Sequence, residues 1–315
     1  MKTRIAFSVV LSFLLALPAA AQQRVGAGSA HMQGAFFIWV AAAASIINKN
    51  VDSVRVTALT TLGSTENLAL MEKGRMQLGA SGSAPLYESY RGEGRWKQPV
   101  KSLRTLYVMY PDYWQVALVK NSSANSLADL KGRKISLQVR GSGGYAITAL
   151  NLQAAGLKDQ DLDAQYLSAD ASIQAMMDRN IEGFSMHGGA PMAGFLELAQ
   201  SRTGLKLLSL SDAEVARIIE RIPYYSKQVI SKDVYPGLEK DVVTVGGVSM
   251  FVAHESLPEE AAYRIVKALS ENGDALVRAY KPAAYSTPQN TVKEGPKYAP
   301  LHPGAVRYFK EKGLL

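Results

Sequence analysis

Short apolar runs alternate with helix-like segments along almost the whole of this 315-residue sequence. Examples are the run at residues 54–59 before the helical pattern at 66–73, and the run at 134–139 before the pattern at 145–155. This alternation is typical of βαβ units built around a parallel or mixed sheet. The chain is also long enough to bury more than one core. The sequence therefore predicts an α/β fold with two lobes.

Two extended stretches indicate where the chain passes between the lobes. Residues 103–119 form two extended runs separated by Pro111, and residues 242–252 form a long apolar strand. A break of this kind after a complete α/β unit suggests a crossing between domains. The stretch at residues 223–237 is predicted to be an irregular connection. The expected boundaries place one lobe at residues 22–110 plus 246–315 and the other at residues 111–245.

The N-terminal segment has the organisation of a secretory signal peptide. Lys2 and Arg4 precede an apolar run over residues 5–17, and Pro18 is followed by three alanines. The run of about 13 residues is shorter than the roughly 20 that span a bilayer, so a membrane anchor is the weaker interpretation. We expect residues 1–21 to be removed on export, leaving a chain that is not inserted in the membrane.

The composition excludes several classes of function. The sequence has no cysteine, which excludes a disulfide framework, thiolate metal sites and a cysteine nucleophile. Its formal net charge is +8, but the basic residues are scattered and an exported protein meets little nucleic acid. No serine has the flanking glycines of a nucleophile elbow, and there is no Walker A sequence or complete dinucleotide fingerprint. We therefore expect no nucleic-acid partner, no metal, no cofactor and no catalysis.

A series of short motifs runs through the chain after residue 25. They are GAGSAHMQGAFF (26–37), GSTENL (63–68), LGASGSAPLYESYRGEG (78–94), SLADLKGRKISL (126–137), GSGG (141–144), GGAP (188–191), YPG with DVVTV behind it (235–245) and LHPGAVRYF (301–309). In this order and spacing they resemble the TAXI-type substrate-binding proteins of tripartite ATP-independent periplasmic (TRAP) transporters. The resemblance implies a type II periplasmic binding protein whose lobes close on a small anionic metabolite, such as glutamate, 2-oxoglutarate or a related dicarboxylate. It also implies a periplasmic location and a sodium-driven TRAP membrane permease as partner.

Two of these motifs place small residues and hydroxyls between a strand and a helix. A helix N-terminus offers unpaired N–H groups and a partial positive charge, so it binds a carboxylate without a metal. Glycine lets the ligand approach the backbone closely. The alternative is a tight turn with serine as the helix cap. The residues predicted to bind ligand from the two loops are Ser29, Gln33, Gly34, Ser142, Gly143 and Gly144.

Further candidates surround these loops. Arg140 stands directly before the GSGG motif, where its guanidinium could hold a carboxylate through two hydrogen bonds, and the alternative is a surface arginine. His31 and His187 fall in loops expected to face the ligand, and each either donates a hydrogen bond to it or has a structural role. The four remaining candidates are short polar residues at the C-terminal ends of strands, where open α/β sheets bind ligands: Ser64, Asn67, Ser81 and Ser83. For Ser64 and Asn67, helix capping is the stronger alternative.

Two other classes of function stay open at this point. The same fold could serve an exported ligand-sensing module that works without a transporter. An exported α/β enzyme, for instance a serine hydrolase, is the less favoured class because its nucleophile motif is missing.

Overall fold

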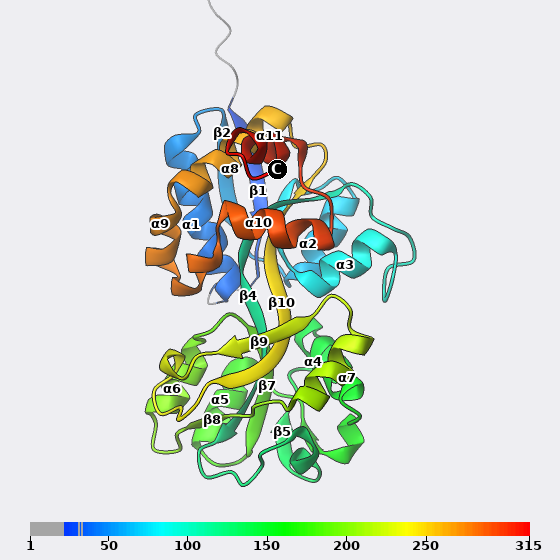
Figure 1. Cartoon of the computed structure of the whole chain (residues 1–315), viewed down its shortest axis with the longest axis vertical. Helices are drawn as coiled ribbons and strands as arrows, with labels where there is room; N and C mark the ends of the chain where they lie inside the picture. Colours follow the sequence, from blue (N-terminus) through cyan, green and yellow to red (C-terminus); the bar gives the residue numbers. More distant parts are fainter. Residues whose placement is uncertain (1–21, 31, 33) are drawn as a thin grey trace, which may run out of the picture.

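The computed structural model describes residues 22–30, 32 and 34–315, so the predicted signal peptide, His31 and Gln33 lie outside the described residues. Two lobes are joined where two long strands run from one lobe into the other (Figure 1). We call this junction the waist, and it comprises residues 110–113 and 246–249. The predicted two-lobed α/β fold is confirmed. The crossing strands are β4 (Leu103–Val119) and β10 (Val242–His254), which pair antiparallel through the waist.

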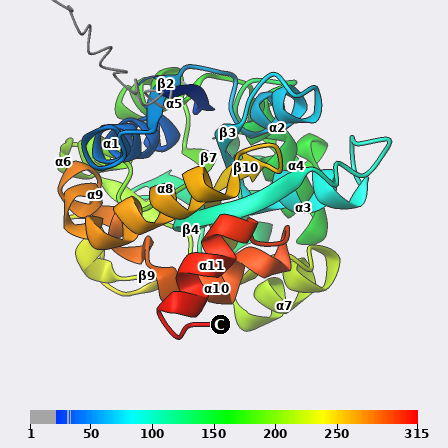
Figure 2. The ribbon, with the colours of Figure 1, turned by 90° about the horizontal axis from the view of Figure 1, so that it is seen from above.

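Lobe 1 is built around the strand order β2-β1-β3-β10-β4, in which β1 is parallel to both of its neighbours. One face of this sheet is covered by α1, α8, α9 and α11, and the other by α2 and α3 (Figure 2). The remaining elements of lobe 1 are β1 (Gln23–Gly28), α1 (Ala35–Asn50), β2 (Val54–Leu59), α2 (Ser64–Glu72), β3 (Leu78–Gly82), α3 (Ser83–Arg91), α8 (Glu259–Glu271), α9 (Gly273–Ala279), α10 (Pro288–Glu294) and α11 (Pro303–Glu311).

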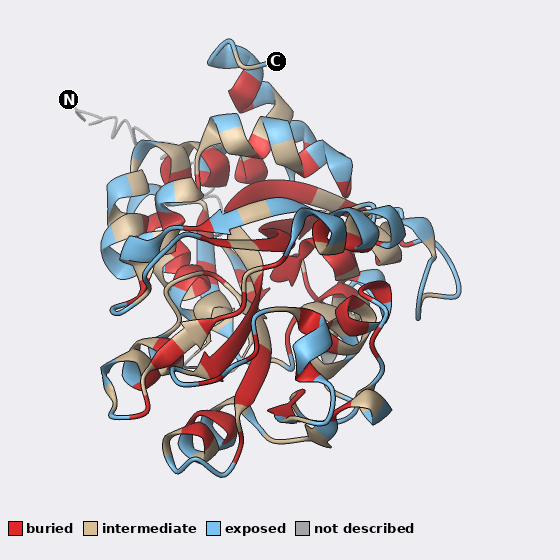
Figure 3. Ribbon diagram, turned by 60° about the horizontal axis from the view of Figure 1, so that its bottom comes forward, coloured by how far each residue is buried: buried red, intermediate tan, exposed pale blue. Residues whose placement is uncertain are grey.

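Lobe 2 continues the same sheet in the order β4-β7-β5-β6, with β8 on β4 and β9 on β10. Buried side chains follow the central strands and the helix faces that pack on them, whereas the outer turns are exposed (Figure 3). The elements of lobe 2 are β5 (Lys134–Ser136), α4 (Gly143–Ala154), β6 (Asp163–Gln165), α5 (Ala169–Met177), β7 (Gly183–Gly188), α6 (Ala193–Gln200), β8 (Leu205–Leu207), α7 (Asp212–Arg221) and β9 (Ser226–Ile230).

Three parts of the chain differ from the sequence-based expectation. Pro111 does not divide the extended stretch, because it pairs with Val248 inside one continuous β4. Residues 223–237, expected to be irregular, contain β9, which begins with polar, exposed residues and therefore shows no apolar alternation. Residues 281–303, whose five prolines predict no helix before a final one at 305–312, contain the short helix α10. The expected lobe boundaries fall within the continuous strands at the waist, and the exact division stays a prediction.

Candidate functional site

Three helices of lobe 1 begin at the waist. The strands β1, β2 and β3 are parallel, and β3 ends beside β10 in the waist, where Gly82 pairs with Ser249. Each strand is followed by a helix, so α1, α2 and α3 all start at this edge of the sheet. Their N-cap residues are Gly34, Gly63 and Gly82, none of which supplies a capping side chain. The helix starts therefore present backbone N–H groups and partial positive charge toward the waist.

Ser29 and Asn67 tie the strand ends of lobe 1 together. The Ser29 hydroxyl donates to the Leu59 carbonyl at 2.6 Å. Asn67 Nδ2 donates to the carbonyl oxygens of Ser29 at 2.9 Å and Ala80 at 2.8 Å, and both side chains are fully buried. The structure thus brings these two predicted residues together. Their polar groups serve the strand ends, and their contact with a ligand stays a prediction.

The other predicted serines of lobe 1 lie beside the start of α3. Ser64 Oγ accepts a hydrogen bond from the Gly82 N–H at 3.1 Å, and Ser81 Oγ donates to the Gly82 carbonyl at 2.9 Å. Ser83 is buried and lies where a side chain on Gly247 would stand. Helix capping by Ser64 or Asn67 is wrong, because α2 begins at Ser64 and its N-cap is Gly63.

The GSGG loop of lobe 2 forms a capped helix start. Ser142 is the N-cap of α4, and its hydroxyl accepts from the Tyr145 N–H at 3.1 Å, which confirms the capping alternative for this side chain. Gly143 is the first residue of α4. A side chain on Gly144 would meet Gln138 Oε1 at 2.0 Å, so a larger residue there would require the Gln138 side chain to move.

Arg140 points to the outer side of lobe 2. Its guanidinium donates to the Tyr166 hydroxyl at 2.7 Å and lies 4.1 Å from the centre of that ring. The Tyr166 and Tyr145 hydroxyls both donate to Asp159 Oδ2, at 3.0 and 2.6 Å. These side chains line a groove of about 730 Å³ between α4 and β6, and none of the other described candidate residues lines it. The structure therefore does not bring Arg140 together with the lobe 1 candidates.

His187 lies on β7 near the waist. Asn151 Nδ2 lies 2.7 Å from Nε2 of its ring, so with the amide as donor the ring proton is on Nδ1. Nδ1 is buried and has no partner among the described residues. Burial lowers the pKa of His187 to about 3, so the ring is neutral near pH 7. His187 is thus placed as an unsatisfied hydrogen-bond donor.

Asp112 is a site residue that the sequence analysis missed. It lies on β4 in the waist, opposite Gly247 of β10. Its carboxylate makes no hydrogen bond or ion pair with any residue that the structure describes, and part of its surface stays accessible. Burial raises the pKa of Asp112 to about 7. A lone acidic residue inside a long apolar strand was the available signal.

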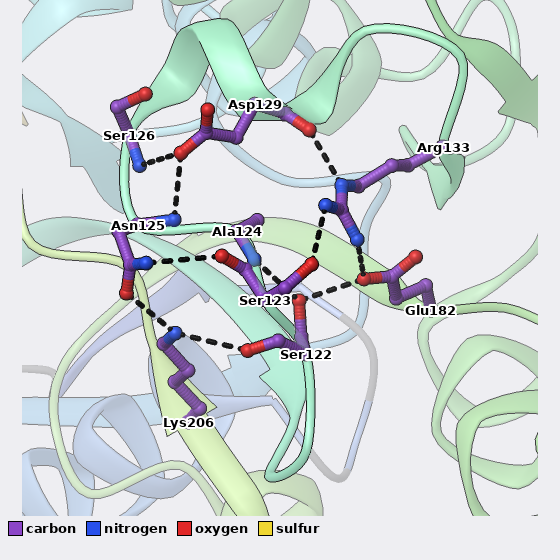
Figure 4. Close-up of polar contacts among 9 residues, drawn as sticks. All are labelled: Ser122, Ser123, Ala124, Asn125, Ser126, Asp129, Arg133, Glu182 and Lys206. Atoms are coloured by element: carbon purple, nitrogen blue, oxygen red, sulfur yellow. Dashed lines mark hydrogen bonds and ion pairs between the residues drawn. The ribbon is translucent and has the colours of Figure 1, made fainter.

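A second polar cluster lies at the opposite end of lobe 2, where Glu182, Arg133, Lys206 and their neighbours are joined by hydrogen bonds (Figure 4). Glu182 Oε1 accepts from Ser122 at 2.7 Å and from Arg133. Arg133 also donates to Ser123 Oγ at 2.8 Å, and Lys206 donates to Asn125 Oδ1 at 2.9 Å. We call these residues the distal network, and its closed pairing indicates a structural role.

The described part of the chain lacks both a metal-binding cluster and a membrane-spanning helix. Within residues 22–30, 32 and 34–315, no group of three or more His, Asp or Glu is placed to hold a metal ion. Over the same ranges, no helix has the length and apolar character needed to cross a membrane.

Several solved binding proteins share this fold. The periplasmic aliphatic sulphonate-binding protein SsuA from Escherichia coli is 16% identical with a TM-score of 0.50, over 92% of this chain and 84% of SsuA. PhnD1 from Prochlorococcus marinus, solved with methylphosphonate, is 10% identical with a TM-score of 0.53, over 93% and 99%. A TctC solute-binding protein from Polaromonas is 12% identical with a TM-score of 0.53, over 95% and 99%.

The fold is therefore that of two-lobed periplasmic solute-binding proteins. The model of the NMT1-like family matches residues 26–313, which is nearly the whole of the chain. The chain belongs to the NMT1-like family.

Proposed function

We propose that the chain is a periplasmic solute receptor that binds a small carboxylate between its lobes and delivers it to a TRAP membrane permease. The observation that carries this proposal is the set of three glycine-capped helix starts, α1, α2 and α3, at one edge of the waist. Such N-termini bind carboxylates through backbone N–H groups without a metal. The proposal includes export through the signal peptide at residues 1–21, and no catalysis.

Two further observations support this proposal. The fold is shared with proteins described as binding sulphonate and methylphosphonate, which are oxyanions like a carboxylate. The TAXI-type motifs favour a TRAP permease as the partner. In this proposal the backbone N–H groups near Gly34 bind from lobe 1, and those of Gly143 and Gly144 bind from lobe 2. Arg140 and His187 are proposed as additional contacts.

The first test is to purify the protein under native conditions and to identify any small molecule that remains bound by mass spectrometry. A panel of glutamate, glutamine, 2-oxoglutarate and C4-dicarboxylates is then added during thermal unfolding. Ligand at about 100 times its dissociation constant is expected to add about 2.7 kcal/mol to the free energy of unfolding. An unchanged melting temperature with every compound, and no small acid in the purified protein, would refute the ligand class. Turnover of a panel member would favour an exported enzyme.

A further inference from the structure

We infer that Asp112 binds a positively charged nitrogen of the solute, so that the solute carries a cationic group as well as a carboxylate. The inference rests on the proposed function, because it concerns the same ligand between the lobes. It adds a residue of the waist that the helix starts of lobe 1 do not include.

The residues beside Asp112 on the neighbouring strands are glycines, which offer its carboxylate no side-chain partner. Its partner on β10 is Gly247, and the next strand, β3, contributes Gly82. A carbon added to Gly82 would lie 3.6 Å from Asp112 Oδ2 and 3.9 Å from Ser64 Oγ. The Asp112 carboxylate, the Ser64 hydroxyl and the start of α3 at Gly82 are therefore close neighbours, and a ligand group bound to Asp112 would lie near that helix start.

Three tyrosines gather around the carboxylate. Burial raises the pKa values of Tyr110, Tyr225 and Tyr280, and the charge of Asp112 raises them further, after that of Tyr280 in the case of Tyr110. The rings of Tyr110 and Tyr280 meet edge to face at 5.0 Å. Both contact Gly189 of lobe 2, where an added carbon would lie 2.4 Å from the Tyr280 hydroxyl. Aromatic rings beside a carboxylate favour a cation, because their faces carry negative electrostatic potential.

Unpartnered polar atoms mark the same region. Ser249 is 1% exposed, and its Oγ has no hydrogen-bond partner among residues 22–30, 32 and 34–315. Ser249 pairs with Gly82 of β3 on one side and with Tyr110 of β4 on the other, so its side chain lies between these two residues of the waist. His187 Nδ1 is the second such atom, and its ring lies 6.0 Å from that of Tyr225. A solute with an acceptor for His187 and a cationic donor for Asp112 would satisfy both ends of this region.

No described lysine, arginine or charged histidine offsets the negative charge of Asp112, since burial alone accounts for its pKa. The groups that face it are Tyr110 on β4, Tyr225 before β9 and Tyr280 after α9, none of which ionises near pH 7. The competing role for Asp112 is a protonated carboxyl that donates to a ligand carboxylate. The two roles predict opposite pH dependence, because the first needs the ionised form and the second the neutral form.

Calorimetric titration with matched compounds separates these roles. The probes are glutamate against 2-oxoglutarate, aspartate against succinate, and 4-aminobutyrate and glycine betaine as further carboxylates that carry a cationic nitrogen. We expect a nitrogen-bearing probe to bind at least about tenfold more tightly than its nitrogen-free partner. Its affinity should rise about tenfold from pH 6 to pH 8, as Asp112 loses its proton.

Two variants complete the test. Asp112→Asn keeps the shape and can still donate to a carboxylate, but it should weaken the cationic probe about 10- to 100-fold. Asp212→Asn removes the same charge at an exposed pair with Lys227 and should leave affinity unchanged. Should Asp112→Asn fail to fold, the pH profile of the unaltered protein gives the answer by itself.

Failure of this inference and failure of the proposed function look different. A nitrogen-bearing probe that binds the unaltered protein and Asp112→Asn equally, or that binds more tightly at pH 6 than at pH 8, overturns the role of Asp112 and leaves the carboxylate receptor intact. The inference is also overturned if nitrogen-free carboxylates bind the unaltered protein but no nitrogen-bearing probe does, even at about 10 times the concentration at which those carboxylates saturate it. If no compound binds and no small acid co-purifies, the proposed function fails as well.

Discussion

The two ends of lobe 2 use similar polar side chains in opposite ways. In the distal network, the carboxylate of Glu182 accepts from both Ser122 and Arg133, so its charge is offset. At the waist, the carboxylate of Asp112 has no partner among the described residues, and nearby His187 keeps an unpaired Nδ1. Lobe 2 thus has one end whose polar groups are satisfied within the fold and one whose groups are left for something else.

The difference separates a structural cluster from a candidate binding region. Buried polar groups are costly unless they are paired, so an unpaired set persists where another molecule or a change of state satisfies it. A closed network can be rich in charge and still be irrelevant to ligand binding. The following experiments test that distinction, beginning with the largest expected effect.

Replacing Gly246 with alanine should destabilise the waist most severely. The added carbon would lie 2.0 Å from the backbone oxygen of Asp112 on the paired strand, which cannot move without disturbing the β4–β10 ladder. We expect the free energy of unfolding to fall by at least about 4 kcal/mol in urea denaturation. Gly273→Ala is the matched control, because nothing lies within 4 Å of its added carbon. Equal stability of the two variants would contradict the close approach at the waist.

The Asp112→Asn variant should gain stability at high pH. The folded carboxyl has a pKa of about 7 against an ordinary value of 3.8, so the folded state keeps a proton that the unfolded state loses. The free energy of unfolding of the unaltered protein therefore receives a contribution that falls as pH rises from about 4 to 7. At pH 8 the variant should be more stable by about 2–3 kcal/mol, and at pH 4 the two should be nearly equal.

Urea unfolding at pH 4, 6 and 8 provides the measurement. The depressed pKa of His187 acts in the opposite direction, since stability from its neutral ring is gained as pH rises from about 3 to 6.5. Both proteins contain His187, so their difference isolates Asp112. A difference that does not change with pH would show that the Asp112 carboxylate is offset after all.

In the distal network, Arg133→Ala should lower stability without touching binding. The change removes the bonds to Glu182 and Ser123 and leaves a half-buried carboxylate without its cation. The expected loss is about 2 kcal/mol, measured by urea unfolding. Arg202→Ala is the control, because Arg202 is an exposed arginine of the same lobe without a side-chain hydrogen bond to the described chain. Ligand affinity that falls more than about twofold with Arg133→Ala would break the division between the two ends.

Replacing Arg140 gives the smallest expected effect, because this residue combines features of the paired side chains and of the proposed ligand contacts. It is an exposed residue that already has a partner, Tyr166, yet it is also a proposed contact for the carboxylate. We expect Arg140→Ala to weaken the identified ligand about three- to tenfold in calorimetric titration, with part of the affinity restored by Arg140→Lys. Tyr166→Phe should preserve affinity, because it removes only the competing hydroxyl. Equal affinity of all variants would return Arg140 to the role of a surface arginine.

The alternation of apolar and helical segments was sufficient to predict most of the fold. β2 occupies the predicted residues 54–59, and the long strand β10 contains the predicted 242–252. β9 was missed because its pairing depends on β10 and not on its own polar residues. The sequence alone predicts a break in the extended stretch at Pro111, because its place inside β4 becomes evident only from its pairing with Val248 of β10.

The candidate site was less predictable than the fold. Ser29 does follow the end of β1, whereas Ser64 and Asn67 lie in the first turn of α2, and the hydrogen bonds of all three to distant backbone groups are set by tertiary structure. Asp112 lacks a side-chain partner on the neighbouring strands because Gly82 and Gly247 stand there, and both are far from it in sequence and near it only across the sheet. No local pattern contains that information.

The continuity of β4 through both lobes has a mechanical consequence. A strand of 17 residues is about 55 Å long, and the part from the waist to Val119 is about 23 Å. If lobe 2 turns by roughly 20° about the waist, a lever of that length carries its far tip through about 8 Å. The loop that the distal network braces follows directly after that tip, so a small rotation at Asp112 would become a large displacement on the surface farthest from it.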